Sequence, residues 1–169
     1  MRVEQQLRES EERFREIFEY APLGMSFIGV DGRFLKVNAA LCRILKRSEE
    51  ELLQMQWMDL IHPDELQSAV WQKERMLASA NGFTEVERRY IRGTGEVVWT
   101  RLRVSLLRNT DRISLYFVVQ VEDVTERRRA EEALRERAAR FRSIADGCPA
   151  IMWVTEASGE VQLDTPPRG

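Results

Sequence analysis

The side chains of this chain that could perform chemistry are few and far apart. The sequence of 169 residues contains one histidine, His62, and two cysteines, Cys42 and Cys148. Acid–base catalysis and metal binding need several such groups at defined spacings, and the sequence has no glycine-rich phosphate loop, nucleophile elbow or Cys/His metal pattern. His62 precedes Pro63 at a predicted helix start, where a lone histidine usually caps or packs. We therefore predict that this chain is not an enzyme and has no catalytic residue and no metal site.

One charged residue, Arg88, stands out because of its position in a strand-like segment, residues 83–92. If Tyr90 points inward, the two-residue period of a strand places Val86 and Arg88 on the same face. An isolated buried charge costs several kcal/mol, so an inward arginine needs a partner or an anion. Two interpretations stay open. Arg88 reaches solvent or pairs with a nearby carboxylate, or it anchors a metabolite that carries a carboxylate.

Composition excludes several classes of protein. The net charge is −2, with 26 Lys and Arg against 28 Asp and Glu, which argues against nucleic-acid binding. No apolar run approaches the roughly 18 residues of a membrane span, and the charged N-terminus is unlike a signal peptide. The expectation is a cytoplasmic chain that makes no membrane contact.

Amphipathic helices are predicted at both ends, over residues 1–20 and 125–146. Their large apolar residues recur at heptad spacing, and the two helices share one phase. The arginine and glutamate residues between them mainly keep the helices solvated, with Arg127 and Arg128 each four residues before a glutamate. We predict a homodimer through these helices, and docking of the first helix on its own domain is the alternative. The proposed dimer seam consists of Val3, Leu7, Phe14, Ile17, Leu134 and Phe141.

The region between these helices has a mixed pattern. Asp31-Gly32 between two β-rich runs predicts a hairpin. Asn38 is expected to cap one helix, and Ser48 with Glu51 forms a capping box for another. Three more strands follow a helix that starts at Pro63. In residues 97–107, Thr100, Leu102, Val104 and Leu106 alternate with Arg101, Arg103 and Ser105, which predicts a strand with one inward face. The prediction is an α+β fold, in which a five-stranded antiparallel sheet carries helices on one face and is flanked by amphipathic N- and C-terminal helices.

The start of the chain is repeated near its end. LRESEERFREIFEYAPLGMSFIGVDG begins at Leu7, and LRERAARFRSIADGCPAIMWVTEASG begins in register at Leu134. The repeat is about one domain long, well above the unit of a solenoid. Residues 21–124 therefore form one complete module, and residues 147–169 are expected to be the disordered start of a second.

These motifs, in this order, resemble the PAS domain with its C-terminal PAC motif, a sensory module of bacterial signalling proteins. The matching stretches are FEYAPLGMSFIGVDGRFLKVNAALCRIL, SEEELLQMQWMDLIHPDE, GEVVWTRLRV and YFVVQVEDVTERRRAEEAL. The resemblance implies a core that can hold a ligand and a terminal Asp-x-Thr triplet, here Asp123 and Thr125, that relays a signal to the next helix. The pocket residues implied in this way are Phe27, Leu41, Leu45, Arg88, Tyr90, Leu102, Phe117, Val119 and Val121.

The resemblance also bears on cofactors. Flavin-binding relatives carry a reactive cysteine in an Asn-Cys-Arg-Phe-Leu-Gln-like helix and a glutamine where this chain has Val121, whereas Cys42 is followed by Arg43-Ile44-Leu45. Haem-binding relatives use a histidine in the long helix, and residues 64–80 contain none. Flavin and haem are therefore not expected. A small organic ligand, anionic if Arg88 holds it, or an empty core remains. The expected function is a sensory module of a histidine kinase or cyclic-di-GMP enzyme, and the alternative is a ligand-free dimerisation or linker domain.

Overall fold

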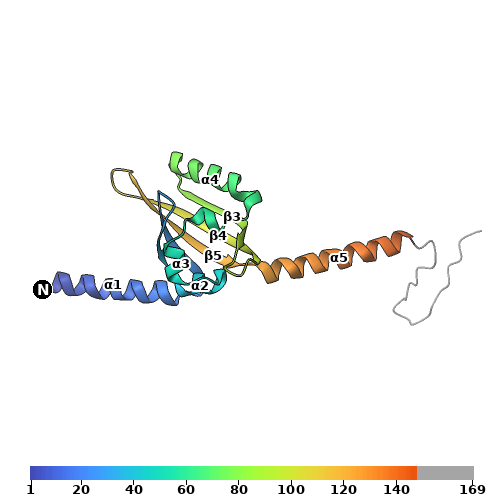
Figure 1. Ribbon diagram of the computed structural model, residues 1–169, viewed down its shortest axis with the longest axis horizontal. Helices are drawn as coiled ribbons and strands as arrows, with labels where there is room; N and C mark the ends of the chain where they lie inside the picture. The colour runs from blue at the N-terminus through green and yellow to red at the C-terminus, as the bar shows by residue number, and fades with distance from the viewer. Residues whose placement is uncertain (148–169) are drawn as a thin grey trace, which may run out of the picture. The chain divides into compact units, whose positions relative to one another are not determined.

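The computed structural model describes residues 1–147, so the expected second module lies almost entirely outside the described residues. The sheet has the order β2-β1-β5-β4-β3, with every neighbouring pair antiparallel, which confirms the predicted α+β class (Figure 1). The helices are α1 (Arg2–Tyr20), α2 (Ala39–Leu45), α3 (Glu49–Leu53), α4 (Leu66–Ala78) and α5 (Thr125–Gly147), with short 3-10 turns η1 (Trp57–Leu60) and η2 (Pro63–Glu65). The strands are β1 (Gly24–Gly29), β2 (Phe34–Val37), β3 (Phe83–Ile91), β4 (Val97–Arg108) and β5 (Ser114–Asp123).

The chain divides into two compact units. The first runs from Met1 to Arg128 and contains the sheet, and the second begins at Arg129 within α5. No helix within residues 1–147 combines the length and apolar character that crossing a membrane requires.

The predicted hairpin and helix caps are present. Gly32 has a φ of +93°, which favours glycine, and its N–H donates to the Gly29 carbonyl at 2.9 Å. Ser48 and Glu51 form the predicted capping box of α3. Asn38 caps α2 by accepting from the N–H of Leu41 at 3.0 Å. These caps depend on residues only a few positions apart, which is why the sequence pattern was sufficient to find them.

One face of the sheet forms the hydrophobic core against the helices between β2 and β3. Alternate residues of β4 point inward, as predicted, with Val98 and Thr100 completely buried. Helix α4 lies beside β3 and β4 (Figure 1). The buried apolar residues of this core include Ile28, Phe34, Leu41, Leu45, Leu52, Leu60, Leu102, Phe117, Val119 and Val121.

Helix α1 packs on the other face of the sheet through aromatic residues. Phe18 is buried and stacks on Phe27 of β1, with ring centroids 5.2 Å apart. Tyr116 of β5 meets Phe27 edge-on at 5.4 Å, and the Lys36 ammonium lies 4.9 Å from the Phe18 ring centroid. The prediction of Phe27 as a pocket residue is therefore wrong. Its neighbour Ile28 points into the core, and the alternation of a strand turns Phe27 to the opposite face.

Candidate functional site

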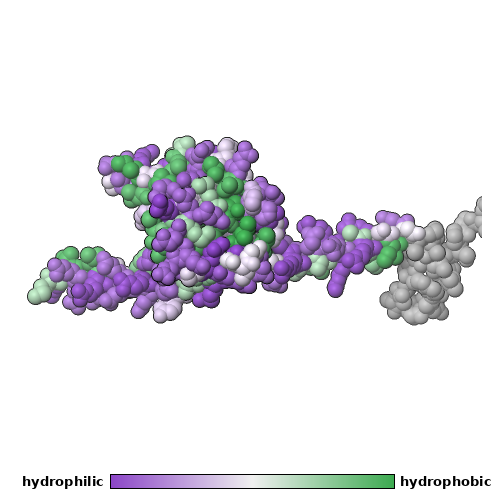
Figure 2. Space-filling view, viewed as in Figure 1, coloured by the Kyte–Doolittle hydropathy of each residue, from purple (hydrophilic) through white to green (hydrophobic). Residues whose placement is uncertain are grey.

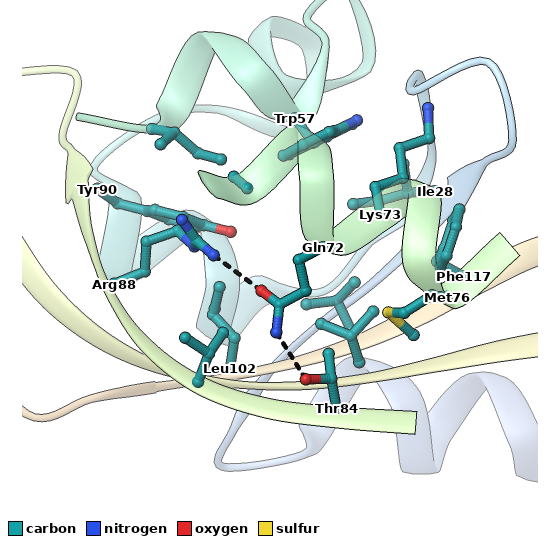
Figure 3. A pocket seen from close by; sticks show the side chains of 15 residues that line it. Ile28, Trp57, Gln72, Lys73, Met76, Thr84, Arg88, Tyr90, Leu102 and Phe117 are labelled. Atoms are coloured by element: carbon teal, nitrogen blue, oxygen red, sulfur yellow. Dashed lines mark hydrogen bonds between the residues drawn. The ribbon is translucent and has the colours of Figure 1, made fainter. Parts of the chain in front are cut away.

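A small cavity lies between α4 and the inner face of the sheet (Figure 3). Its volume is about 70 Å³, whereas ligand pockets usually measure roughly 300–1,000 Å³. Apolar side chains supply most of its wall, and a few polar groups converge on it. It is lined by Ile28, Trp57, Ile61, Ala69, Gln72, Lys73, Met76, Thr84, Val86, Arg88, Tyr90, Leu102, Val104, Phe117 and Val119.

Arg88 is the central polar residue of this cavity. It is only 5% exposed, and its guanidinium group donates to the Glu65 carbonyl and to Ser68 Oγ, both at 3.0 Å. It also donates to Oε1 of Gln72 at 2.8 Å. None of the ion pairs within residues 1–147 involves Arg88. Arg88 is thus inward and hydrogen-bonded only to neutral oxygens, so it neither reaches solvent nor pairs with a carboxylate.

Gln72 extends this polar network across the cavity. Its amide nitrogen donates to Thr84 Oγ1 at 2.7 Å, so that one glutamine of α4 joins two residues of β3 (Figure 3). Tyr90 lies next to Arg88 in the same view, and burial raises the pKa of its phenol despite the opposing charge of Arg88. Tyr90 therefore remains a neutral hydroxyl throughout the physiological pH range.

The second charged group at the cavity is Lys73, whose ammonium lies 5.9 Å from the ring centroid of Trp57. Lys73 and Arg88 give the cavity two positive charges and no lining carboxylate among the described residues. This arrangement favours an anion over a cation or a neutral amine.

The structure brings together only part of the predicted pocket. Arg88, Tyr90, Leu102, Phe117 and Val119 line the cavity. The other aliphatic candidates are buried in the core without lining the cavity; these are Leu41, Leu45 and Val121.

The sequence interpretation missed Gln72, Lys73 and Thr84 at the cavity. A signal for one of them was present. Ser68, Gln72 and Met76 follow one another at four-residue intervals and therefore share a helix face.

The two residues of the terminal triplet join α5 to the sheet. Asp123 accepts from the N–H of Thr125 at 2.9 Å and forms an ion pair with Arg92 at 2.8 Å. The Thr125 hydroxyl accepts from the N–H of Trp99 in β4 at 3.0 Å. Asp123 thus caps the start of α5, and Thr125 attaches this start to the neighbouring strand.

The residues of the predicted dimer seam are exposed within their own units, and Figure 2 shows hydrophobic surface on both α1 and α5. The outward residues of α1 include Val3, Leu7 and Ile17, while Phe14 is half-covered by its ring contacts with Phe18 and Phe27. In α5 the exposed seam residues are Leu134 and Phe141. The aromatic end of α1 therefore docks on its own domain, and the rest of its apolar stripe lacks a cover among the described residues.

The remaining chemical candidates have structural positions. Nδ1 of His62 accepts from the N–H of Asp64 at 3.3 Å, which places it as a cap of η2. Cys42 is a free thiol whose pKa is raised by burial and, to a smaller extent, by the charges of Glu49 and Glu19. Within the described part of the chain, no cluster of three or more His, Cys, Asp or Glu side chains could hold a metal ion.

Comparison with known proteins identifies the family. A family model described as PAS domain matches residues 22–126. DgcE of Escherichia coli (strain K12), described as a probable diguanylate cyclase, is 37% identical over 135 residues, which is 80% of this chain and 12% of DgcE. Sporulation kinase E of Bacillus subtilis (strain 168) is 30% identical over 148 residues, which is 86% of this chain and 19% of the kinase.

A solved structure agrees in fold. The PAS domain of an HTR-like protein from Haloarcula marismortui matches with a TM-score of 0.62 at 20% identity, covering 72% of this chain and 98% of that one. The chain spans less than a fifth of the length of the two curated relatives named above. By sequence and by fold, this chain belongs to the PAS domain family.

Proposed function

We propose that this chain is a cytoplasmic, non-catalytic sensory domain of a larger bacterial signalling protein, either a cyclic-di-GMP enzyme or a histidine kinase. Its similarity to parts of a cyclase and a kinase supports a role in signal transduction. In this proposal, β5 and the start of α5 form the PAC motif, and the repeat that begins at Leu134 is the entry to a second PAS domain.

The ligand that we propose is a small organic anion, held by Arg88. The observation that carries this proposal is a buried guanidinium group without a carboxylate partner, at the wall of a largely apolar cavity. Neutral acceptors satisfy its hydrogen bonds but leave its charge uncompensated, and a carboxylate would supply both a bidentate acceptor and the opposite charge. A cavity of about 70 Å³ accepts only a short acid unless α4 moves.

Calorimetry and native mass spectrometry on the purified chain test the ligand, with acetate, propionate and pyruvate as probes. We expect Arg88→Met to weaken binding of the best probe by at least about tenfold, because it removes a charged hydrogen-bond donor. Arg88→Lys keeps the charge but loses the fork of donors and should weaken binding less.

The matched control is Arg108→Met. Arg108 also ties α4 to the sheet, by donating to the carbonyls of Ser79, Leu77 and Met76 at 2.8, 3.0 and 3.2 Å, but it does not line the cavity. This variant should bind the probes as the wild type does. Equal binding by wild type and Arg88→Met, or binding of no probe and no co-purifying acid, contradicts the ligand proposal.

We also propose that the chain forms a homodimer through its terminal helices. The exposed heptad residues of α1 and α5 support this, because large apolar side chains at that spacing are typical of helix pairing. Light scattering over a range of concentrations checks the mass. A monomer at high concentration, or an unchanged dimer in the doubly substituted Leu7→Glu/Leu134→Glu chain, contradicts this assignment.

The second candidate function is a ligand-free dimerisation or linker domain. The small volume of the cavity and the satisfied hydrogen bonds of Arg88 favour it. The two candidates differ in the calorimetric result, since only the sensory function requires a ligand-dependent change.

A further inference from the structure

Two neighbouring residues of β3 serve opposite faces of the sheet. Arg88 points into the cavity, and Glu87 therefore points to the face on which α1 packs. The backbone carbonyl of Arg88 accepts from Thr100 Oγ1 at 2.8 Å, which fixes this part of β3 to β4. A displacement of Arg88 consequently moves the Glu87 side chain as well, because one short, hydrogen-bonded segment of backbone carries both.

Glu87 binds the first turn of α5. Arg127 donates to Oε1 of Glu87, and Arg128 donates to Oε2 at 2.8 Å. Arg101, directly opposite on β4, donates to Oε1 at 3.3 Å. We call Glu87 with Arg127 and Arg128 the Glu87 clamp.

The charge state of Glu87 agrees with this geometry. Partial burial acts to raise the pKa of its carboxyl, but the hydrogen bonds and charges of Arg127, Arg101 and Arg128 outweigh burial and lower it below its usual range. The carboxylate is therefore ionised at neutral pH, as its hydrogen bonds with Arg127 and Arg128 require.

Trp99 reinforces the same contact. The Arg128 guanidinium carbon lies 3.6 Å from the centroid of the Trp99 ring. The N–H of Trp99 donates to Thr125 Oγ1, and the Trp99 carbonyl accepts from the N–H of Val124. A single exposed ion pair contributes only about 0–1 kcal/mol, but a guanidinium held between a carboxylate and an aromatic face has a defined position. The clamp is therefore suited to transmit small shifts of β3.

We propose that Glu87 is a positioning residue through which the state of the cavity controls the first turn of α5. This inference rests on the proposed sensory function. An anion at Arg88 competes with its acceptors on η2 and α4, Arg88 and β3 shift, and the carboxylate of Glu87 moves Arg127 and Arg128 with it. This route starts from β3, whereas the Asp123 contacts start from β5, and the two meet at Trp99, which contacts both Arg128 and Thr125.

A substitution at Gln72 can replace the unidentified ligand in the test. Gln72→Glu has nearly the same shape and places a carboxylate where Oε1 now lies 2.8 Å from Arg88. The Thr84 hydroxyl can donate to this carboxylate where it now accepts, so the network stays satisfied. Gln72→Leu, which removes an acceptor from Arg88, is the second perturbation.

The measurement is NMR of the full chain, following the amide shifts and hydrogen exchange of Arg128 and Trp99. We expect Gln72→Glu to change exchange at these amides roughly threefold, the scale of one ion pair acting on a local opening equilibrium. In the Glu87→Gln background the same substitution should leave both amides unchanged, and Glu87→Asp should restore part of the response.

The matched control is Glu85→Gln. Glu85 lies on the same face of β3 and pairs with Arg103 at 2.9 Å and Arg101 at 3.9 Å. In the Glu85→Gln background, Gln72→Glu should change exchange at Arg128 and Trp99 as much as it does in the wild type. An equal response with and without the Glu87 carboxylate, or loss of the response in Glu85→Gln as well, overturns the inference. The ligand proposal can fail independently. In that case no probe binds at Arg88, while Gln72→Glu still changes exchange at Arg128 and Trp99.

Discussion

We expect replacement of Asn38 to cause a large loss of unfolding free energy for so small a side chain. Its side chain is 1% exposed and makes four hydrogen bonds to backbone groups of three different elements or their ends. Oδ1 accepts from the N–H groups of Met25 and Leu41 at 2.8 and 3.0 Å. Nδ2 donates to the carbonyls of Phe18 and Leu23 at 2.9 and 3.0 Å. One amide thus joins the end of α1, β1 and the start of α2.

Asn38→Ala leaves these four backbone groups without their partner in a place that water reaches poorly. At about 1 kcal/mol for each hydrogen bond, the expected loss is about 4 kcal/mol of unfolding free energy. That is a large part of the roughly 5–15 kcal/mol of a typical domain. Urea unfolding, followed by far-ultraviolet circular dichroism and by tryptophan fluorescence, measures the loss.

Asn109→Ala provides the matched control. Oδ1 of Asn109 accepts from the N–H groups of Asp111 and Ile113 at 3.0 and 2.9 Å in the exposed turn between β4 and β5, where water can replace it. We expect a loss of about 1 kcal/mol or less. If Asn38→Ala costs no more than Asn109→Ala, the reasoning from buried hydrogen bonds is refuted.

Asn38→Asp separates the two halves of the network. The aspartate keeps the acceptor for Met25 and Leu41 but places a carboxylate against the carbonyls of Phe18 and Leu23. Its protonated form can donate to one of these carbonyls, so the variant should lose less stability at pH 4 than at pH 7 relative to wild type. The same loss at both pH values contradicts this account.

Three further predictions concern a glycine, an acid and a thiol. Gly93→Ala should lower the free energy of unfolding in urea by about 1–3 kcal/mol, because the new Cβ would lie only 2.4 Å from the Lys46 carbonyl oxygen. The control Gly95→Ala meets no atom within 4 Å but has a φ of +87°, so it should cost about 1 kcal/mol. A larger loss at Gly95 than at Gly93 would contradict the steric argument. Because the pKa of Glu87 is lowered in the folded chain, its carboxylate stabilises the fold above the ordinary carboxyl pKa of 4.5, and this contribution is lost as pH falls through the folded-state pKa. Glu87→Gln should therefore reduce the slope of unfolding free energy against pH on the acid side. An unchanged slope would show that the clamp does not stabilise the fold. Because burial raises the pKa of Cys42, iodoacetamide should alkylate the Cys42 peptide at least about tenfold more slowly in the native chain than in urea, as mass spectrometry can measure, and equal rates would contradict its placement.

The sequence by itself determined the features that depend on near neighbours. The Asp31-Gly32 hairpin, the caps at Asn38 and Ser48, and the inward face of β4 follow from short-range spacing, and all are present. The period of two made an inward Arg88 conditional on an inward Tyr90, because strand alternation is a local property of the backbone, and both side chains are buried. The order of these motifs also identified the PAS family.

Only the tertiary structure decided which distant groups meet. Arg88 is surrounded by Glu65, Ser68 and Gln72 because α4 lies over β3 at a particular rotation, and helix periodicity alone does not fix that rotation against the sheet. Phe27 faces α1 and not the cavity. The sequence did not show this, because a strand covered on both faces has apolar residues at successive positions and no clear alternation.

The arginines at the start of α5 make the same point. Sequence spacing suggested that Arg127 and Arg128 serve a solvated helix face. In the folded chain both reach Glu87, which lies 40 and 41 positions earlier. Long side chains choose among all charges within reach, and which charges these are depends on the path of the backbone through space, which local sequence patterns do not specify.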